Sequence, residues 1–172
     1  MLDGKTQSVL GEMWQEACKR GGNLSFKIVS GSMSPMIEVG NVVRVSRTEP
    51  SKVRIGDIVA FKQDGQSVVV HRIIGKSLSD ARLTFREMGD AGGPSGRIAA
   101  QDIIGRAIVI EKDGREICLD SPRHILGSRV FGWRLLLVET LGRMQNGHFS
   151  TVVKLTLRPM WRLCRRLLLW RL

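Results

Sequence analysis

Cysteine and histidine are both scarce in this 172-residue chain. The three cysteines, Cys18, Cys118 and Cys164, are widely scattered, odd in number and without paired metal-ligand spacing, so neither a disulfide framework nor a zinc site is indicated. The three histidines form no His-x-x-x-His cluster, which argues against a metal-dependent hydrolase. No phosphate-binding loop of the P-loop or dinucleotide type is present. We therefore expect a protein that works without a metal or cofactor.

The chain also lacks a long apolar run near its start. Charged residues interrupt residues 1–24, which contain nothing approaching the roughly 20 apolar residues that a spanning helix needs. A basic region followed by an apolar core is missing too, so we expect no cleavable signal peptide. Apolar residues instead recur at helical spacing, which predicts an amphipathic helix that ends near Gly21: Val9, Leu10, Met13, Trp14 and Ala17. Core packing is its expected use, and a shallow membrane or partner contact stays open.

The middle of the chain alternates short apolar runs with turns. The predicted strands are residues 41–46, 57–61, 67–74, 82–87, 103–111 and 115–119. The pairs Asp64-Gly65 and Asp113-Gly114 lie between such runs and are typical of hairpins. This pattern predicts a mainly β fold with an antiparallel core of sandwich or open-barrel type. With 42% hydrophobic residues the chain can bury one good core, so we expect one β domain over 25–120, preceded by the helix of 1–24 and followed by an extension over 121–172.

The net charge of +11 is concentrated in that C-terminal extension, where ten Arg or Lys residues face one acid, Glu139. A helical projection of residues 161–172 separates arginines from apolar residues, and this suits an interface between water and anionic lipid. The predicted membrane-contact residues are Trp161, Arg162, Arg165, Arg166 and Trp170. Because arginines interrupt each apolar stretch, we expect peripheral membrane association rather than a transmembrane span, with the cytoplasmic face favoured.

Two other uses of the basic extension stay open. Its leucines and Val138 fit packing on the β core or on a protein partner, which leaves the final helix as a solvated basic end. Nucleic-acid contact is the least favoured use, because no recognised reading motif accompanies the charge. Charge patterning alone does not identify an anionic partner.

A serine-rich turn and a distant histidine are the residues that point most directly to chemistry. In Ser30-Gly31-Ser32-Met33-Ser34-Pro35, the glycine and proline favour a constrained bend that could present the Ser32 hydroxyl. A serine nucleophile needs an adjacent base, and His71, after the apolar run 68–70, could be delivered to it by strand pairing. The hydroxyl of Ser30 could reach an oxyanion. A simple Ser/Gly turn and a strand-edge histidine are the alternative interpretation.

Four segments together resemble the type I signal peptidase family. They are Gly31-Ser32-Met33-x-Pro35, Gly56-Asp57-Ile58-Val59-Ala60-Phe61, His71-Arg72-Ile73-Ile74 and Gly89-Asp90-Ala91, in the family's order and approximate spacing, over roughly residues 26–110. Most bacterial members pair the serine with a lysine, whereas His71-Arg72 stands at that place here. The chain thus resembles the serine–histidine branch, and the resemblance implies a fold related to the self-cleaving LexA-like repressors.

The resemblance also implies roles for individual residues. Ser32 would be the nucleophile, His71 the general base, and Ser30 with the Ser32 amide the oxyanion donors. The branch usually carries an acid several positions beyond its Gly-Asp, but residues 91–97 hold no carboxylate. Asp90 is therefore the expected orienter of the imidazole, with Asp102 a poor second, although Asp90 could equally bond its own backbone in a Gly-rich loop. Family members usually carry an N-terminal membrane anchor as well, which residues 1–24 do not resemble.

These observations favour a signal-peptidase-like serine endopeptidase that cleaves a peptide or precursor protein near small residues by a Ser/His mechanism. One alternative is a catalytically weak protein of the same fold that binds a peptide or acts as a membrane-associated scaffold. Another is a LexA-like self-cleaving protein, although no DNA-reading helix pair is evident near the N-terminus. The sequence does not define the oligomeric state.

Overall fold

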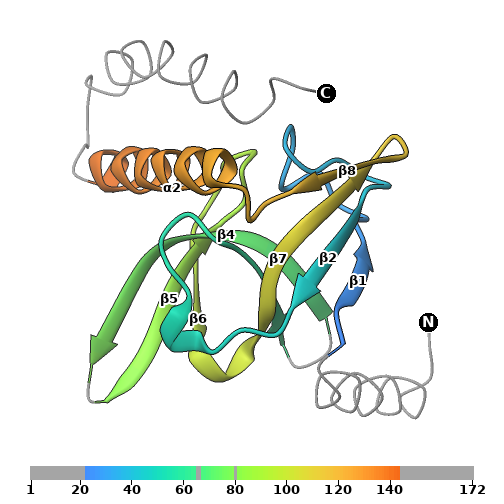
Figure 1. The fold of residues 1–172 in the computed structure, drawn as a ribbon. Coiled ribbons are helices and arrows are strands. Elements are labelled where there is room, and N and C mark those ends of the chain that lie inside the picture. Colours follow the sequence, from blue (N-terminus) through green and yellow to red (C-terminus); the bar gives the residue numbers. More distant parts are fainter. Residues whose placement is uncertain (1–21, 65–66, 80, 144–172) are drawn as a thin grey trace.

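The computed structural model describes residues 22–64, 67–79 and 81–143, including the backbone but not the side chains of 141–143 (Figure 1). The predicted helix of 1–24 falls almost wholly outside this part. The predicted membrane-contact residues fall outside it too: Trp161, Arg162, Arg165, Arg166 and Trp170. Those two predictions stay predictions.

The described residues form a mainly antiparallel β fold with a single α-helix among them, which confirms the predicted fold class. The strands are β1 (Leu24–Lys27), β2 (Val42–Ser46), β3 (Ile58–Gln63), β4 (Ser67–Ser79), β5 (Arg82–Met88), β6 (Gly96–Ala99), β7 (Ile103–Lys112) and β8 (Arg115–Cys118). Two short 3-10 helices, η1 (Pro50–Lys52) and η2 (Ala100–Asp102), interrupt them, and α2 (Pro122–Arg143) follows.

The strands join one sheet in the order β1-β2-β7-β3-β4-β5-β6, with β8 paired to β7. β7 connects its two halves, because it pairs with β2 over Arg106 to Glu111 and with β3 over Ile103 to Arg106. Register shifts interrupt the pairs β2–β7, β3–β7 and β4–β5. Such irregularities increase local twist and bend a strand, which agrees with the strongly bent sheet in Figure 1.

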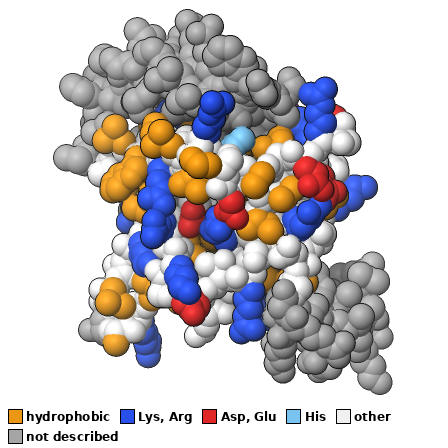
Figure 2. All heavy atoms as spheres, viewed as in Figure 1, with side chains coloured by type: hydrophobic (Ala, Val, Ile, Leu, Met, Phe, Trp, Pro, Cys, Tyr) orange, Lys and Arg blue, Asp and Glu red, His pale blue; other side chains and the backbone are white. Residues whose placement is uncertain are grey.

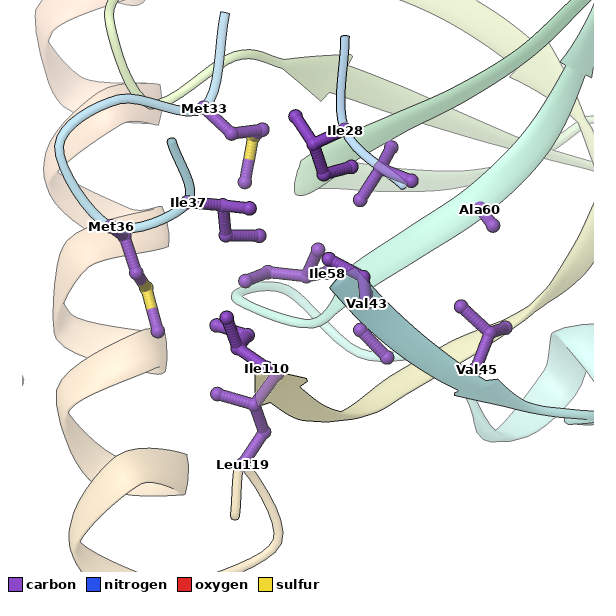
Figure 3. Close-up of a cluster of buried hydrophobic side chains, with 12 residues drawn as sticks. Ile28, Met33, Met36, Ile37, Val43, Val45, Ile58, Ala60, Ile110 and Leu119 are labelled. Atoms are coloured by element: carbon purple, nitrogen blue, oxygen red, sulfur yellow. The ribbon is translucent and has the colours of Figure 1, made fainter. Parts of the chain in front are cut away.

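The turn that carries Ser32 is fixed by its own apolar side chains. Met33 and Ile37 are 1% and 0% exposed, and Met36 is also buried. Figure 3 shows these side chains pointing from the turn into a cluster with Ile28 and Ile58. Burying an aliphatic side chain contributes on the order of 1.5–3 kcal/mol. Ser32, directly before Met33, is therefore presented by a segment that the core holds in place.

Helix α2 lies across one end of the sheet and packs on β4 (Figure 1). Its Phe131 and Leu135 are buried against Ile74 of β4. The approach is close: a Cβ on Gly56 would stand 2.7 Å from the backbone of α2, and one on Gly132 would stand 2.8 Å from the backbone of Gly56. Two glycines thus allow the helix backbone to sit directly on the loop before β3.

The described part of the chain holds no helix that is both long and apolar enough to cross a membrane. On the face seen in Figure 2, Lys and Arg side chains are spread among hydrophobic and acidic ones.

Candidate active site

The structure brings Ser32 and His71 together although 39 positions separate them. The Ser32 hydroxyl lies 2.9 Å from Nε2 of His71. Strand pairing achieves this, because β4 holds His71 opposite Val59 of β3 while the turn after β1 presents the serine. A hydroxyl at hydrogen-bond distance from an imidazole nitrogen is the geometry that a serine nucleophile and its base require.

The other ring nitrogen of His71 is bonded to a carboxylate that the sequence analysis did not select. Nδ1 of His71 lies 2.5 Å from Oε2 of Glu87, and the two side chains are 20% and 11% exposed. A carboxylate only accepts hydrogen bonds when ionised, so Nδ1 carries the proton and Nε2 is left to accept from Ser32. The geometry thus selects the tautomer that a serine base needs.

Asp90, the expected orienter, lies elsewhere. Its two carboxylate oxygens accept from Nε and Nη2 of Arg72, at 2.7 and 2.6 Å, and the Arg72 and Asp90 side chains are 0% and 2% exposed. The expected contact of Asp90 with the imidazole is therefore wrong. Consecutive side chains of a strand point to opposite faces, so His71 and Arg72 must diverge and take different carboxylates. Asp102, the second choice, ends η2, and both ring nitrogens of His71 already have the partners described above.

Arg72 connects the site to helix α2. Its Nη1 donates to the carbonyl of Gly56 at 2.8 Å and to the hydroxyl of Ser128 on α2. The guanidinium also lies 5.1 Å from the centre of the Phe131 ring. A buried charge of this kind is tolerated because it is paired and hydrogen-bonded. Arg72, the residue directly after the candidate base, is thus held by three other segments of the chain: the loop of Asp90, the loop of Gly56 and helix α2.

Glu87 reaches His71 because β6 offers no side chain opposite it. Glu87 pairs with Gly96, and a Cβ at that glycine would stand only 2.0 Å from Oε1 of Glu87. The loop of Gly89 is just as tightly placed, since a Cβ there would be 2.5 Å from the Ser32 carbonyl oxygen. Ala91 N–H donates to that same oxygen at 2.9 Å. These contacts fix the backbone of Ser32 from the side of the Gly-Asp loop.

Ser30, the predicted oxyanion donor, is exposed, and its hydroxyl lies 3.3 Å from that of Ser32. Within the described residues, the Ser32 N–H donates to no backbone carbonyl. The predicted oxyanion role of these two groups stays a prediction.

A cleft of about 380 Å³ opens beside Ser32. One wall is β1 with the residues that follow it, and the other is the segment Val68 to Val70 of β4. In the described part of the sheet, β1 pairs on one side only, and β4 pairs with β5 only from Arg72 onward. The cleft thus lies between two strand edges with unpaired backbone groups. Val29 at its wall is 85% exposed, which leaves an apolar surface beside the serine.

Glu87 could have been found from the sequence only with the strand register in hand. It lies three residues before Asp90, whereas the family resemblance leads one to expect the acid downstream of the Gly-Asp pair. Its signal is an acid inside a predicted strand, in register with Ile73, two residues after His71, and with a glycine across from it on the other side.

Comparison with known proteins gives a partial similarity. A comparison with protein-family models finds no match. Among curated proteins, the chain is 33% identical over 64 residues to signal peptidase I W of Bacillus subtilis (strain 168). The matched stretch covers 37% of this chain and spans about a third, 34%, of that relative's length. The match therefore supports a relationship to signal peptidases, and hence to peptidases, over part of the chain.

Proposed function

We propose that this protein is a serine endopeptidase that uses Ser32, His71 and Glu87 to cleave a peptide or precursor protein. The observation that carries the proposal is the continuous hydrogen-bonded chain from the Ser32 hydroxyl through both nitrogens of His71 to Glu87. The partial similarity to signal peptidase I supports the same class of reaction. In this proposal Glu87 replaces Asp90 as the residue that orients the base.

The reaction follows from the positions of these groups. Ser32 Oγ attacks the carbonyl carbon of the scissile peptide bond while its proton passes to Nε2 of His71. Glu87 stabilises the imidazolium that forms. When the tetrahedral intermediate collapses, the C–N bond breaks and the imidazolium gives its proton to the leaving amine. Water, activated in turn by His71, then attacks the acyl-enzyme ester and releases the carboxylic acid and free Ser32.

The negative oxygen of the tetrahedral intermediate needs donors that are already in place. The Ser32 N–H and the Ser30 hydroxyl fill this role in the proposal. The Ser32 backbone is held by the Ala91 N–H on its carbonyl and by buried Met33 next to it. The donors therefore need little rearrangement during the reaction, which is the condition under which they contribute most.

The substrate is proposed to bind as an extended strand between the edges of β1 and β4. Unpaired backbone groups on strand edges accept an added strand, and pockets between them select alternate side chains. The cleft of about 380 Å³ is too small for several large side chains at once, which favours small residues near the cleaved bond. Val68, Val69 and Phe26 give it an apolar lining.

The basic C-terminal extension is proposed to dock the protein peripherally on an anionic membrane, with the cytoplasmic face favoured. The support is the pattern of arginine and tryptophan in residues 161–172. A membrane surface would hold the site near precursor proteins that are themselves membrane-bound.

The test compares cellular protein N termini in strains that express wild-type protein or Ser32→Ala at equal levels. We expect a set of termini that disappears in Ser32→Ala and in His71→Ala, because removing the nucleophile or base of such a unit costs on the order of 10⁶ in turnover. Ser34→Ala is the matched control, since it removes a hydroxyl from the same turn outside the proposed machinery.

Two other results would contradict the proposal, and a third would reveal a defect in folding. Termini that are identical in all four strains would favour a peptide-binding protein without protease activity. Termini lost equally in Ser34→Ala would indicate a folding defect in the turn. A fragment of the protein itself, seen by mass spectrometry only when Ser32 is present, with all other termini unchanged, would favour self-cleavage.

A further inference from the structure

A second and larger cleft, of about 980 Å³, lies apart from the candidate active site and shares no lining residue with it. It is formed by η1, η2, the start of β7 and the first turns of α2. Five basic residues line it: Arg47, Lys52, Arg54, Arg106 and Arg129. None of them has a part in the proposed peptidase reaction.

The acids in this cleft do not balance its positive charge. Three carboxylates line it, and two of them are taken by ion pairs, Lys52 with Glu49 at 3.1 Å and Arg106 with Asp120 at 2.5 Å. The third, Asp57, accepts the backbone N–H of Arg54 at 2.9 Å. Burial raises the pKa of Asp57, although that bond and nearby arginines oppose the shift. Five cations against three acids leave a net positive cleft at neutral pH.

Arg129 carries the most specific sign of a missing ligand. Its Nε is buried, and among the described residues it has no hydrogen-bond partner. A buried donor without a partner costs roughly 1–3 kcal/mol, so native structures seldom keep one unless something binds there. The backbone of Arg129 is fixed, because it sits against Gly56 and follows Ser128, whose hydroxyl donates to the Gly56 carbonyl at 2.9 Å.

The rest of the lining indicates what sort of anion would fit. Ile104 and Ile125 contribute half-buried apolar surface next to the arginines. Guanidinium groups bind phosphate oxygens with two parallel hydrogen bonds, which suits clustered arginines to phosphate better than to a single carboxylate. The volume exceeds that of a bare phosphate ion, so an organic remainder has room on the isoleucine side.

We infer that this cleft binds the phosphate group of a phosphoester, with Arg129 and Arg54 as its principal donors. A lipid headgroup and a soluble phosphoester present the same chemistry. Binding of either ligand does not require the peptidase reaction, so an experiment can refute the phosphate site without refuting the proposed peptidase function, and the reverse.

The test uses the full-length Ser32→Ala protein and records the side-chain Nε–H signals of arginine by NMR. Inorganic phosphate is titrated in, with sodium chloride at matched ionic strength as the reference. We expect a saturable shift of the Arg129 signal that chloride does not produce. Arg54→Gln should weaken phosphate affinity about tenfold or more, the usual effect of losing one charge-assisted contact. Arg115→Gln, which removes the same charge from exposed β8, should leave it unchanged.

Vesicles distinguish the two sources of phosphate. If wild-type protein binds phosphatidylcholine vesicles containing phosphatidylglycerol more tightly than Arg54→Gln and Arg129→Gln do, the ligand is a lipid headgroup. If phosphate shifts the Arg129 signal but all variants bind vesicles equally, the ligand is a soluble phosphoester. The inference is overturned if phosphate shifts no signal beyond chloride, or if Arg115→Gln weakens the binding as much as Arg54→Gln. Arg54 is exposed, so its replacement should not disturb folding.

Discussion

Replacing Gly96 by alanine is the sharpest test of how Glu87 supports the candidate base. The new Cβ would stand 2.0 Å from Oε1 of Glu87, whereas ordinary contact begins near 3.4 Å. The carboxylate must therefore withdraw by about 1.4 Å from a position in which it holds His71 Nδ1 at 2.5 Å. The carboxylate is the far end of a flexible side chain, so it can move without forcing the strands apart.

The expected loss of activity follows from that displacement. A misplacement of about 1 Å in an active site costs roughly 10²-fold, and complete loss of the carboxylate's orienting role costs about 10⁴-fold in turnover. We expect Gly96→Ala to lower kcat between these limits, with KM and the melting temperature nearly unchanged. The assay is cleavage of a peptide taken from a terminus that depends on Ser32. The downfield NMR signal of the His71 Nδ1 proton should weaken in parallel.

A double-mutant comparison ties the effect to Glu87. If Gly96→Ala acts only by displacing the carboxylate, it should cost nothing further in a Glu87→Gln background. Gly75→Ala is the matched control, because that glycine lies in β4, on the other side of β5 from Gly96, and its added Cβ would meet Arg86 Cβ at 3.2 Å rather than Glu87. Full activity in Gly96→Ala with an unchanged His71 signal would refute the reasoning, as would additive losses in the double variant.

Two further predictions concern stability. Asp90→Asn should lower the free energy of unfolding by about 3–5 kcal/mol, because it leaves Arg72 as a buried charge without its carboxylate. Urea unfolding measures this change. Glu87→Gln should by contrast lower turnover while it reduces the free energy of unfolding far less. Asp57→Asn should stabilise the protein at neutral pH. Burial raises the folded-state pKa of Asp57 above its usual 3.8, so the folded state favours the neutral acid. The contribution of neutral Asp57 to the free energy of unfolding is therefore fully present below pH 3.8 and is lost as pH rises through the folded-state pKa. Urea unfolding measured from acid to neutral pH should show the free energies of unfolding of wild type and Asp57→Asn converging in acid. A difference that stays constant with pH would contradict the raised pKa of Asp57.

The sequence predicted several strands closely, because their apolar alternation and flanking turns are local signals, but it ended the longest strand, β4, five residues too early. Among the eight strands of the described residues, four agree with prediction to within one residue at each end: β2, β5, β7 and β8. β1 and β6 were not predicted. Each has four residues and lies at an end of the sheet order, so cross-strand pairing rather than local propensity defines it.

The residues of the candidate site also differ in whether a local sequence signal could identify them. Ser32 and His71 could be selected because each has a local signal, a constrained turn and an apolar run. Glu87, the carboxylate that supports His71, has no such local signal. The β4–β5 register decides which acid lies on the same face as His71. His71 and Arg72 are adjacent and so point to opposite faces, where they take Glu87 and Asp90 respectively. One acid therefore acts on the candidate base and the other on the core under α2, and this is why Glu87→Gln and Asp90→Asn should separate turnover from stability.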